Sequence, residues 1–184
     1  MASARRDLVT QRTAMINRLK APGAEPVAKR LRIVLAALEQ TIKDLGRDMA
    51  ALIKNHAPLK NVSQTLQTIP GVGPVTALEL TAFMPELGTL TRRQAAALAG
   101  LAPHPRQSGG HDGYRRTQGG RQTVKTTLFM AAMAAARFHP QLASFHQRLR
   151  NNGKKPLVAL TAVMRKLILI ANAKIRDALS LQLS

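Results

Sequence analysis

The sequence contains no cysteine and no tryptophan, and aromatic residues make up only 3% of its 184 residues. Without cysteine, disulfides and cysteine-ligated zinc fingers are excluded, and a reducing cytosol is allowed. The scarcity of aromatic rings argues against binding single-stranded nucleic acid by base stacking, which needs a platform of rings. It also argues against a membrane-surface helix, which carries Trp or Phe on its apolar face.

Long apolar runs are also missing. No segment offers about 20 consecutive apolar residues, the length that a helix needs to cross a membrane. The first residues, MASARRDLVTQRT, hold no apolar run of signal-peptide length. We therefore expect no membrane partner and a cytoplasmic location.

Acidic residues are the third scarce group, with nine Asp and Glu against 28 Lys and Arg. No pair of them lies close together in a predicted loop, and neither Asp-x-Asp nor His-x-x-x-His occurs. A two-metal nuclease site needs several converging carboxylates, so we expect no metal site in this chain. The net charge is +19, and the positive groups of a compact chain would repel one another unless a polyanion neutralised them. Duplex DNA or structured RNA, contacted through phosphates, is the expected partner.

Helical patterns cover almost all of the chain, so the predicted fold class is all-α. A first helix is expected over residues 3–20 and a second over residues 26–55, with APGAEP between them. In the second helix apolar residues recur at heptad spacing with one stutter: Val27, Leu31, Val34, Leu38, Ile42, Leu45, Met49 and Leu52. This pattern predicts a coiled-coil-like arm over residues 1–57, either an antiparallel helical pair or a dimerisation arm. A helix packed on its own domain is the alternative.

Residues 58–184 are expected to form a helical domain. The stretch TIPGVGPVTALEL predicts a helix-hairpin-helix over residues 66–84, in which Gly71 and Gly73 let the backbone approach a phosphate. A plain turn between two helices is the alternative. Thr91 is a candidate cap for a short helix, and three more helices are expected after residue 120. The last of them is apolar over a wide face, and we expect it to be buried.

The stretch PHPRQSGGHDGYRRTQGGRQTVK is expected to be a basic, glycine-rich loop over residues 102–125 that carries Ser108. A serine hydroxyl that attacks a phosphodiester needs positive groups to meet the developing charge, and the forked donors of Arg match phosphate oxygens. The candidate phosphate-binding residues are Arg106, Arg115, Arg116, Arg121 and Lys125. The residues alone leave two alternatives open. The loop could contact DNA without chemistry, or Ser108 could pair with His104 or His111.

Four stretches carry a resemblance to a known family: TIPGVGPVTALEL, AGLAPHPRQSGG, GGRQTVKTTLFMAAMAA and HPQLASFHQRLRNNGKKPLVALTAVMRKLILIANAKIRD. From about Leu66 to Asp177 the chain resembles the C-terminal half of bacterial insertion-sequence transposases of the DEDD, serine-dependent type related to the Piv invertase. The resemblance implies an N-terminal RuvC-like domain with four acidic metal ligands, a coiled-coil arm that pairs protomers, and a serine that links covalently to DNA. That serine maps onto Ser108, and the metal ligands map onto nothing in this chain.

The resemblance implies a role in DNA transposition or site-specific recombination, with Ser108 as the nucleophile. We expect this chain to be inactive alone, because the acidic domain and its Mg²⁺ are not part of it. The expected partners are double-stranded DNA and a second copy of the chain, as a homodimer or a higher oligomer. A structured guide RNA is a further candidate, since some family members use a bridge RNA. The expected location is the bacterial cytoplasm, in association with the nucleoid. The alternative is a non-catalytic, nucleic-acid-binding, dimer-forming remnant of an insertion element.

Overall fold

The computed structural model describes residues 1–108 and 111–183; for residues 105–108, 111–116 and 182–183 it describes the backbone alone. The described chain is mostly helical, which agrees with the predicted all-α class apart from one β-hairpin. It divides into two compact units, Met1–Ala57 and Pro58–Ser184.

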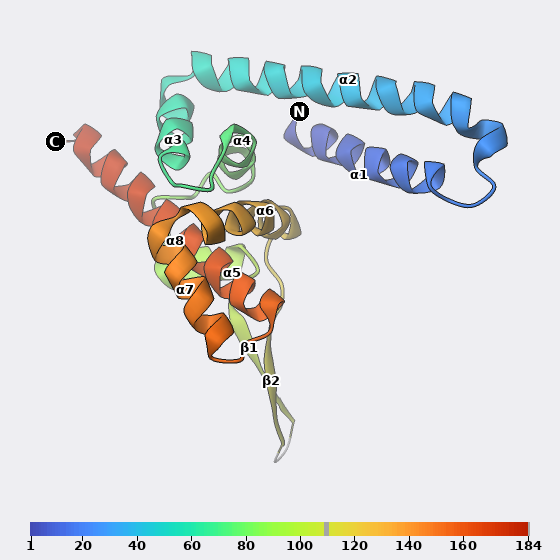
Figure 1. Ribbon diagram of the computed structural model, residues 1–184. Coiled ribbons are helices and arrows are strands. Elements are labelled where there is room, and N and C mark those ends of the chain that lie inside the picture. Colours follow the sequence, from blue (N-terminus) through green and yellow to red (C-terminus); the bar gives the residue numbers. More distant parts are fainter. Residues whose placement is uncertain (109–110, 184) are drawn as a thin grey trace. The chain divides into compact units, whose positions relative to one another are not determined.

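The first unit is an antiparallel pair of helices, α1 (Ala2–Leu19) and α2 (Glu25–Asn55), which pack side by side (Figure 1). A short turn joins them, and Pro26 in the first turn of α2 suits a helix start because its missing N–H would be unpaired there anyway. Of the heptad residues, only Ile42 and Met49 are buried. This arrangement matches the antiparallel alternative; pairing of protomers through a coiled coil stays a prediction.

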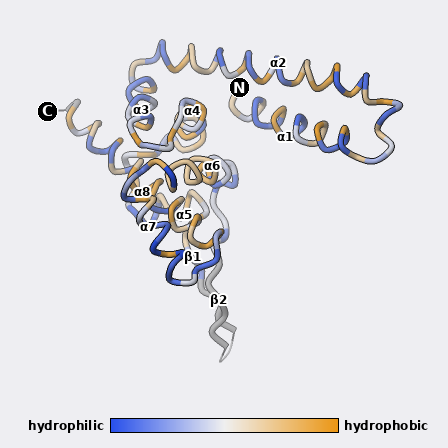
Figure 2. The backbone as a smooth tube through the Cα atoms, in the orientation of Figure 1, coloured by the Kyte–Doolittle hydropathy of each residue, from blue (hydrophilic) through white to orange (hydrophobic). Residues whose placement is uncertain are grey.

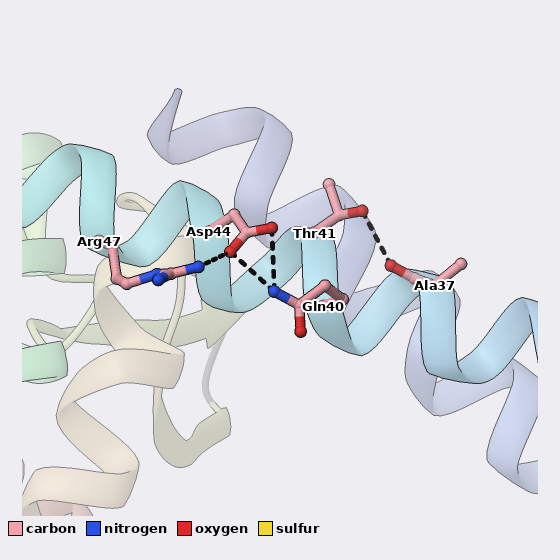
Figure 3. A network of polar contacts seen from close by, with 5 residues as sticks. All are labelled: Ala37, Gln40, Thr41, Asp44 and Arg47. Carbon is pink, nitrogen blue, oxygen red and sulfur yellow. Dashed lines mark hydrogen bonds and ion pairs between the residues drawn. The ribbon is translucent and has the colours of Figure 1, made fainter.

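The polar face of α2 carries a network of local contacts around Asp44 (Figure 3). Its carboxylate accepts hydrogen bonds from Gln40 Nε2 at 2.9 and 3.1 Å and from Arg47. The hydrogen bond from Arg47, and then that from Gln40, lowers the pKa of Asp44 below its ordinary value. Because these groups are exposed and lie on one helix, the network contributes little to the stability of the fold.

The second unit contains six helices in its described part: α3 (Ala57–Gln67), α4 (Pro74–Phe83), α5 (Arg92–Leu98), α6 (Gln122–Phe138), α7 (Pro140–Asn151) and α8 (Pro156–Leu183). Helix α8 packs against α5, α6 and α7, and α4 packs against α6. Leu128 of α6 and Leu167 and Ile168 of α8 are fully buried. Three buried alanines of α6, among them Ala132, let the neighbouring helices approach closely.

Helix α5 begins directly after Thr91, the residue that the sequence predicted as its cap. The backbone N–H of Gln94 donates to Thr91 Oγ1 at 3.3 Å, and the N–H of Thr91 donates to Gln94 Oε1 at 2.9 Å. This reciprocal capping box satisfies two N–H groups that the helix itself leaves unpaired.

Helix α8 contains a stretch, Pro156–Leu181, that is long and apolar enough to cross a membrane by length and composition alone. Figure 2 shows apolar residues along this helix interrupted by hydrophilic ones. Its inner side belongs to the core, since Val163, Leu167 and Ala171 are at most 1% exposed. The core helix of a soluble domain passes the same test, so the stretch is weak evidence for a membrane span.

Most of the segment expected as a loop, residues 102–125, forms a β-hairpin instead, and its last residues, from Gln122, begin α6. Strand β1 (Pro103–Ser108) pairs antiparallel with β2 (His111–Thr117). The physical reason is that pairing between the strands satisfies backbone N–H and C=O groups that an open loop leaves to water. A sequence signal for it exists, because a Gly-Gly pair between two short runs is typical of a hairpin.

Candidate nucleic-acid interface at the β-hairpin

The hairpin brings most of the candidate site residues onto one two-stranded element. Arg106 and Ser108 lie on β1, and Arg115 and Arg116 lie on β2. In the register Ser108 stands opposite His111, and His104 stands opposite Arg116. The strands extend away from the helices of their unit (Figure 1). The backbone therefore places Ser108 at the far end of β1, with the two consecutive arginines on the partner strand.

The base of the hairpin is held by a close approach between two glycines. Gly100 follows α5 and Gly120 precedes α6, and both have positive φ, 67° and 70°. A Cβ on Gly120 would lie 2.2 Å from the Gly100 nitrogen and 2.6 Å from the Ala97 carbonyl oxygen. The N–H of Arg121 also donates to the Leu98 carbonyl at 2.7 Å. Only glycine fits such a contact, so these residues fix the point from which the hairpin starts and to which it returns.

Arg121 was a candidate phosphate ligand, and the structure gives its guanidinium another partner. It donates to both carboxylate oxygens of Glu86, at 2.8 and 2.6 Å, and to the Phe83 carbonyl at 2.9 Å. The hydrogen bond from Arg121 is the main cause that lowers the pKa of Glu86 to about 2. In this geometry Arg121 joins the start of α6 to the segment after α4, and contact with phosphate stays a prediction.

Sequence reasoning missed Glu86 as part of this region. It lies 35 residues before Arg121, and no short-range pattern links the two. The available signal is compositional. Glu86 is one of nine acidic residues in a strongly basic chain, and an acid in such a background has many cations with which to pair.

Lys125 lies in the first turn of α6, beside the end of β2. Its Nζ reaches Thr117 Oγ1 at 3.4 Å, a long contact that leaves the ammonium able to bind another group. Next to it is a cavity of about 270 Å³. The cavity is lined by Thr117, Gln122, Lys125, Thr126, Phe129, Leu157, Thr161 and Met164. Lys125 is thus a cation at the base of the hairpin that a phosphate can approach.

Gly71 and Gly73 lie in the turn between α3 and α4, away from the hairpin base. Gly71 has φ 96°, and a Cβ there would lie 2.6 Å from the backbone nitrogen of Ala135 in α6. Ala135 is ten residues after Lys125 on the same helix, roughly 15 Å along its axis. Gly73 precedes the first residue of α4 and has open space at its Cβ position. Gly71 therefore serves packing within the domain, and nucleic-acid contact by either glycine stays a prediction.

In the described ranges, no group of three or more His, Asp and Glu side chains could hold a metal ion. Mg²⁺ stays an expectation for a separate acidic domain, and no step of the chemistry proposed below passes through it.

Comparison with known proteins shows that this region is similar to a transposase family. Residues 63–147, which contain the α3–α4 turn and the whole hairpin, match the Transposase IS116/IS110/IS902 family. The chain is 28% identical over 145 residues to the Insertion element IS116 uncharacterized 44.8 kDa protein of Streptomyces clavuligerus, covering 78% of this chain and 35% of that protein. It is 30% identical over 141 residues to the Pilin gene-inverting protein of Moraxella bovis, covering 74% of this chain and 44% of that protein.

A third relative is the Insertion element IS900 uncharacterized 42 kDa protein of Mycobacterium paratuberculosis, which is 26% identical over 159 residues. That alignment covers 84% of this chain and 38% of the relative. The chain thus spans less than half the length of the curated relatives it matches. The similarity to the Transposase IS116/IS110/IS902 family covers residues 63–147, which include the serine hairpin.

Proposed function

We propose that this chain is the DNA-binding, serine-bearing part of a transposase or site-specific recombinase, with Ser108 as the nucleophile. The observation that carries the proposal is the position of Ser108 inside the family match, at the end of a hairpin whose other strand carries Arg115 and Arg116. Arginines that bind the attacked phosphate supply the positive charge that a phosphoryl-transfer transition state needs, and Arg106 lies two residues from Ser108 on the same strand.

The proposed step exchanges one phosphoester bond for another. The Oγ of Ser108 attacks the phosphorus of a DNA backbone phosphate and forms an O–P bond, while the bond between phosphorus and the departing strand oxygen breaks. The serine proton ends on that departing oxygen, so the products are a phosphoserine link and a free strand hydroxyl. Arg106, two residues from Ser108 on β1, would hold the oxygens of the attacked phosphate, and Arg115, Arg116 and Lys125, nearer the hairpin base, would hold neighbouring phosphates of the same duplex.

The proposed partners follow from the charge and from the arm. Duplex DNA neutralises the +19 charge. The arm would pair two copies of the chain, because α2 leaves Val27, Val34 and Leu52 between 45% and 57% exposed. The same proposal has three further parts. The chain would use a guide RNA and would act in the bacterial cytoplasm in association with the nucleoid. It would also need a separate acidic domain.

The test is a comparison of this chain with its Ser108→Ala variant. Each is mixed with labelled duplex DNA and Mg²⁺, with and without the N-terminal part of the IS116 protein added in trans. We expect covalent protein–DNA adducts on denaturing gels only with wild-type Ser108 and only with the added part. The affinity for duplex should be equal in the two proteins.

Two results would contradict the proposal. Adducts that persist in Ser108→Ala would show that another residue attacks DNA. No adduct from either protein, with binding retained, would favour a non-catalytic nucleic-acid-binding remnant of an insertion element.

A further inference from the structure

The turn between α7 and α8 carries a second concentration of positive charge, separate in sequence from the hairpin. Four cations lie within eight residues: Arg148 and Arg150 in the last turns of α7, and Lys154 and Lys155 just before α8. All four are exposed. We call these four residues, together with Lys166 of α8, the α7–α8 basic surface.

In the described part of the chain, none of these five residues forms an ion pair with a carboxylate. The sequence contains no Asp or Glu between Asp112 and Asp177. Among the described residues, Arg47 pairs with Asp44, Arg121 with Glu86 and Arg176 with Asp177, and all of these residues lie outside the surface. A solvated helix face usually mixes charges of both signs, whereas five cations without an acid create a field that attracts a polyanion.

Local contacts hold several of these cations in place. The ring of Phe145 contacts two of them: Lys166 Nζ is 4.0 Å from the ring centroid and the Arg148 guanidinium carbon is 5.6 Å from it. Such cation–π contacts order long side chains while leaving their charge able to act on a ligand. Arg150 donates one guanidinium hydrogen bond to the Lys154 carbonyl at 2.6 Å and so closes the turn.

The turn also offers room for a ligand. A recess of about 360 Å³ is lined by Gly153, Lys154, Lys155 and Val158. A Cβ placed on Gly153 would meet nothing within 4 Å, so the backbone is open to approach there. Phe145 already contacts two cations, which leaves its ring less available for stacking a base. These features suit the phosphate backbone of a duplex better than an unpaired strand.

We propose that the α7–α8 basic surface is a second DNA-binding surface, which holds the backbone of duplex DNA through its phosphates independently of the serine hairpin. The inference rests on the proposed function, since it takes DNA as the partner of this chain. This surface would contact DNA without reading its sequence, and the affinity that it contributes would fall steeply as the salt concentration rises.

The test compares two triple variants that remove the same charge. One replaces Arg148, Lys154 and Lys155 with Gln and keeps Arg150 to close the turn. The control replaces the exposed arm residues Lys29, Arg30 and Arg32 with Gln. Binding of a fluorescein-labelled duplex of about 24 base pairs and arbitrary sequence is followed by anisotropy at about 50 to 300 mM NaCl, a range in which phosphate contacts dominate.

We expect the surface variant to bind at least about tenfold more weakly at 0.1 M salt, with the slope of log K against log salt reduced by roughly 2 to 3, because each phosphate contact contributes about 0.9. The arm control should change the slope by less than about 1. If the surface variant does not fold, as judged by circular dichroism, the double change Lys154→Gln and Lys155→Gln should reduce the slope by roughly 2.

Three outcomes overturn the proposal. The first is equal affinity and slope in the surface variant and the arm control. The second is lost binding to phosphatidylserine vesicles with DNA affinity unchanged, which would make the surface a membrane contact. In the third, neither the surface variant nor Arg115→Gln with Arg116→Gln binds DNA more weakly, and the proposed function fails as well. If only the variant with Arg115→Gln and Arg116→Gln binds DNA more weakly, the α7–α8 proposal is wrong and the proposed function stands.

Discussion

The two units of this protein use helices of similar length in different ways. Helix α2 of the arm has 31 residues and buries two side chains, Ile42 and Met49. Helix α8 has 28 residues and buries Val163, Leu167 and Ile168 among others, because it packs against three helices of its unit. A pair of helices can cover only one stripe of each partner, whereas a helix in a layered core is covered on most sides. Apolar periodicity therefore predicts a helix in both units, and burial depends on how many neighbours that helix has.

The largest expected effect comes from deleting a core side chain in the second unit. Leu167→Ala should reduce the free energy of unfolding by about 3 to 4 kcal/mol, since Leu167 is fully buried and a cavity would remain. Ile33→Ala in the arm should change it by less than about 0.5 kcal/mol, because Ile33 is 66% exposed. Urea unfolding at low protein concentration measures both. A similar loss in the two variants would mean that a second copy of the chain covers the arm in solution.

A change at the hairpin base should be nearly as costly. Gly120→Ala should destabilise the second unit by about 3 kcal/mol, from the left-handed backbone and from the clash with Gly100. Gly119→Ala is the matched control, because Gly119 has φ 69° but nothing within 4 Å of its Cβ position. It should cost about 1 kcal/mol, from the backbone alone. Thermal unfolding measures the stability of the Gly120→Ala and Gly119→Ala variants. Equal losses of stability in the two would exclude a tight contact at Gly120.

The smallest effect concerns the ion pairs of the two units and depends on pH. The pKa of Glu86 falls from 4.5 to about 2 in the folded protein, so the pair with Arg121 stabilises the fold above pH 4.5. That contribution is lost as the pH falls from 4.5 to about 2. Because both side chains are more than a third exposed, it should amount to about 1 kcal/mol after discounting for solvent screening.

Glu86→Gln and Asp44→Asn separate the two ion pairs in urea unfolding at several pH values. The Glu86→Gln variant should have a lower free energy of unfolding than the wild type at pH 6. Between pH 4.5 and 2 its free energy of unfolding should fall less than that of the wild type. Asp44→Asn should leave the unfolding curve of the second unit unchanged, because Asp44 is bonded only within α2 in the described contacts. Identical acid profiles in Glu86→Gln and the wild type would show that the Arg121 contact does not stabilise the fold.

Much of the fold was predictable from local patterns. The helices of the arm, the Thr91 cap and the burial of the last helix follow from apolar spacing, from capping chemistry and from a wide apolar face. The hairpin was missed because glycine and arginine dominate its composition and hide the strand signal. In the candidate site, Ser108 and the five cations were named from the sequence without their geometry and their roles stay predictions, whereas Glu86 was not predicted at all.

The sequence by itself determined the charge, the helical periodicity and the resemblance that singles out Ser108, because each of these is a property of residue types and their local order. Only the tertiary structure decided the partners of Arg121 and Gly71 and the close approach of Gly100 to Gly120. Those contacts join residues from 20 to 64 positions apart. They depend on how the helices pack, and short-range spacing carries no information about packing. The basic stretch around Ser108 thus became a hairpin with a fixed base, set in a domain that carries a second basic surface at the α7–α8 turn.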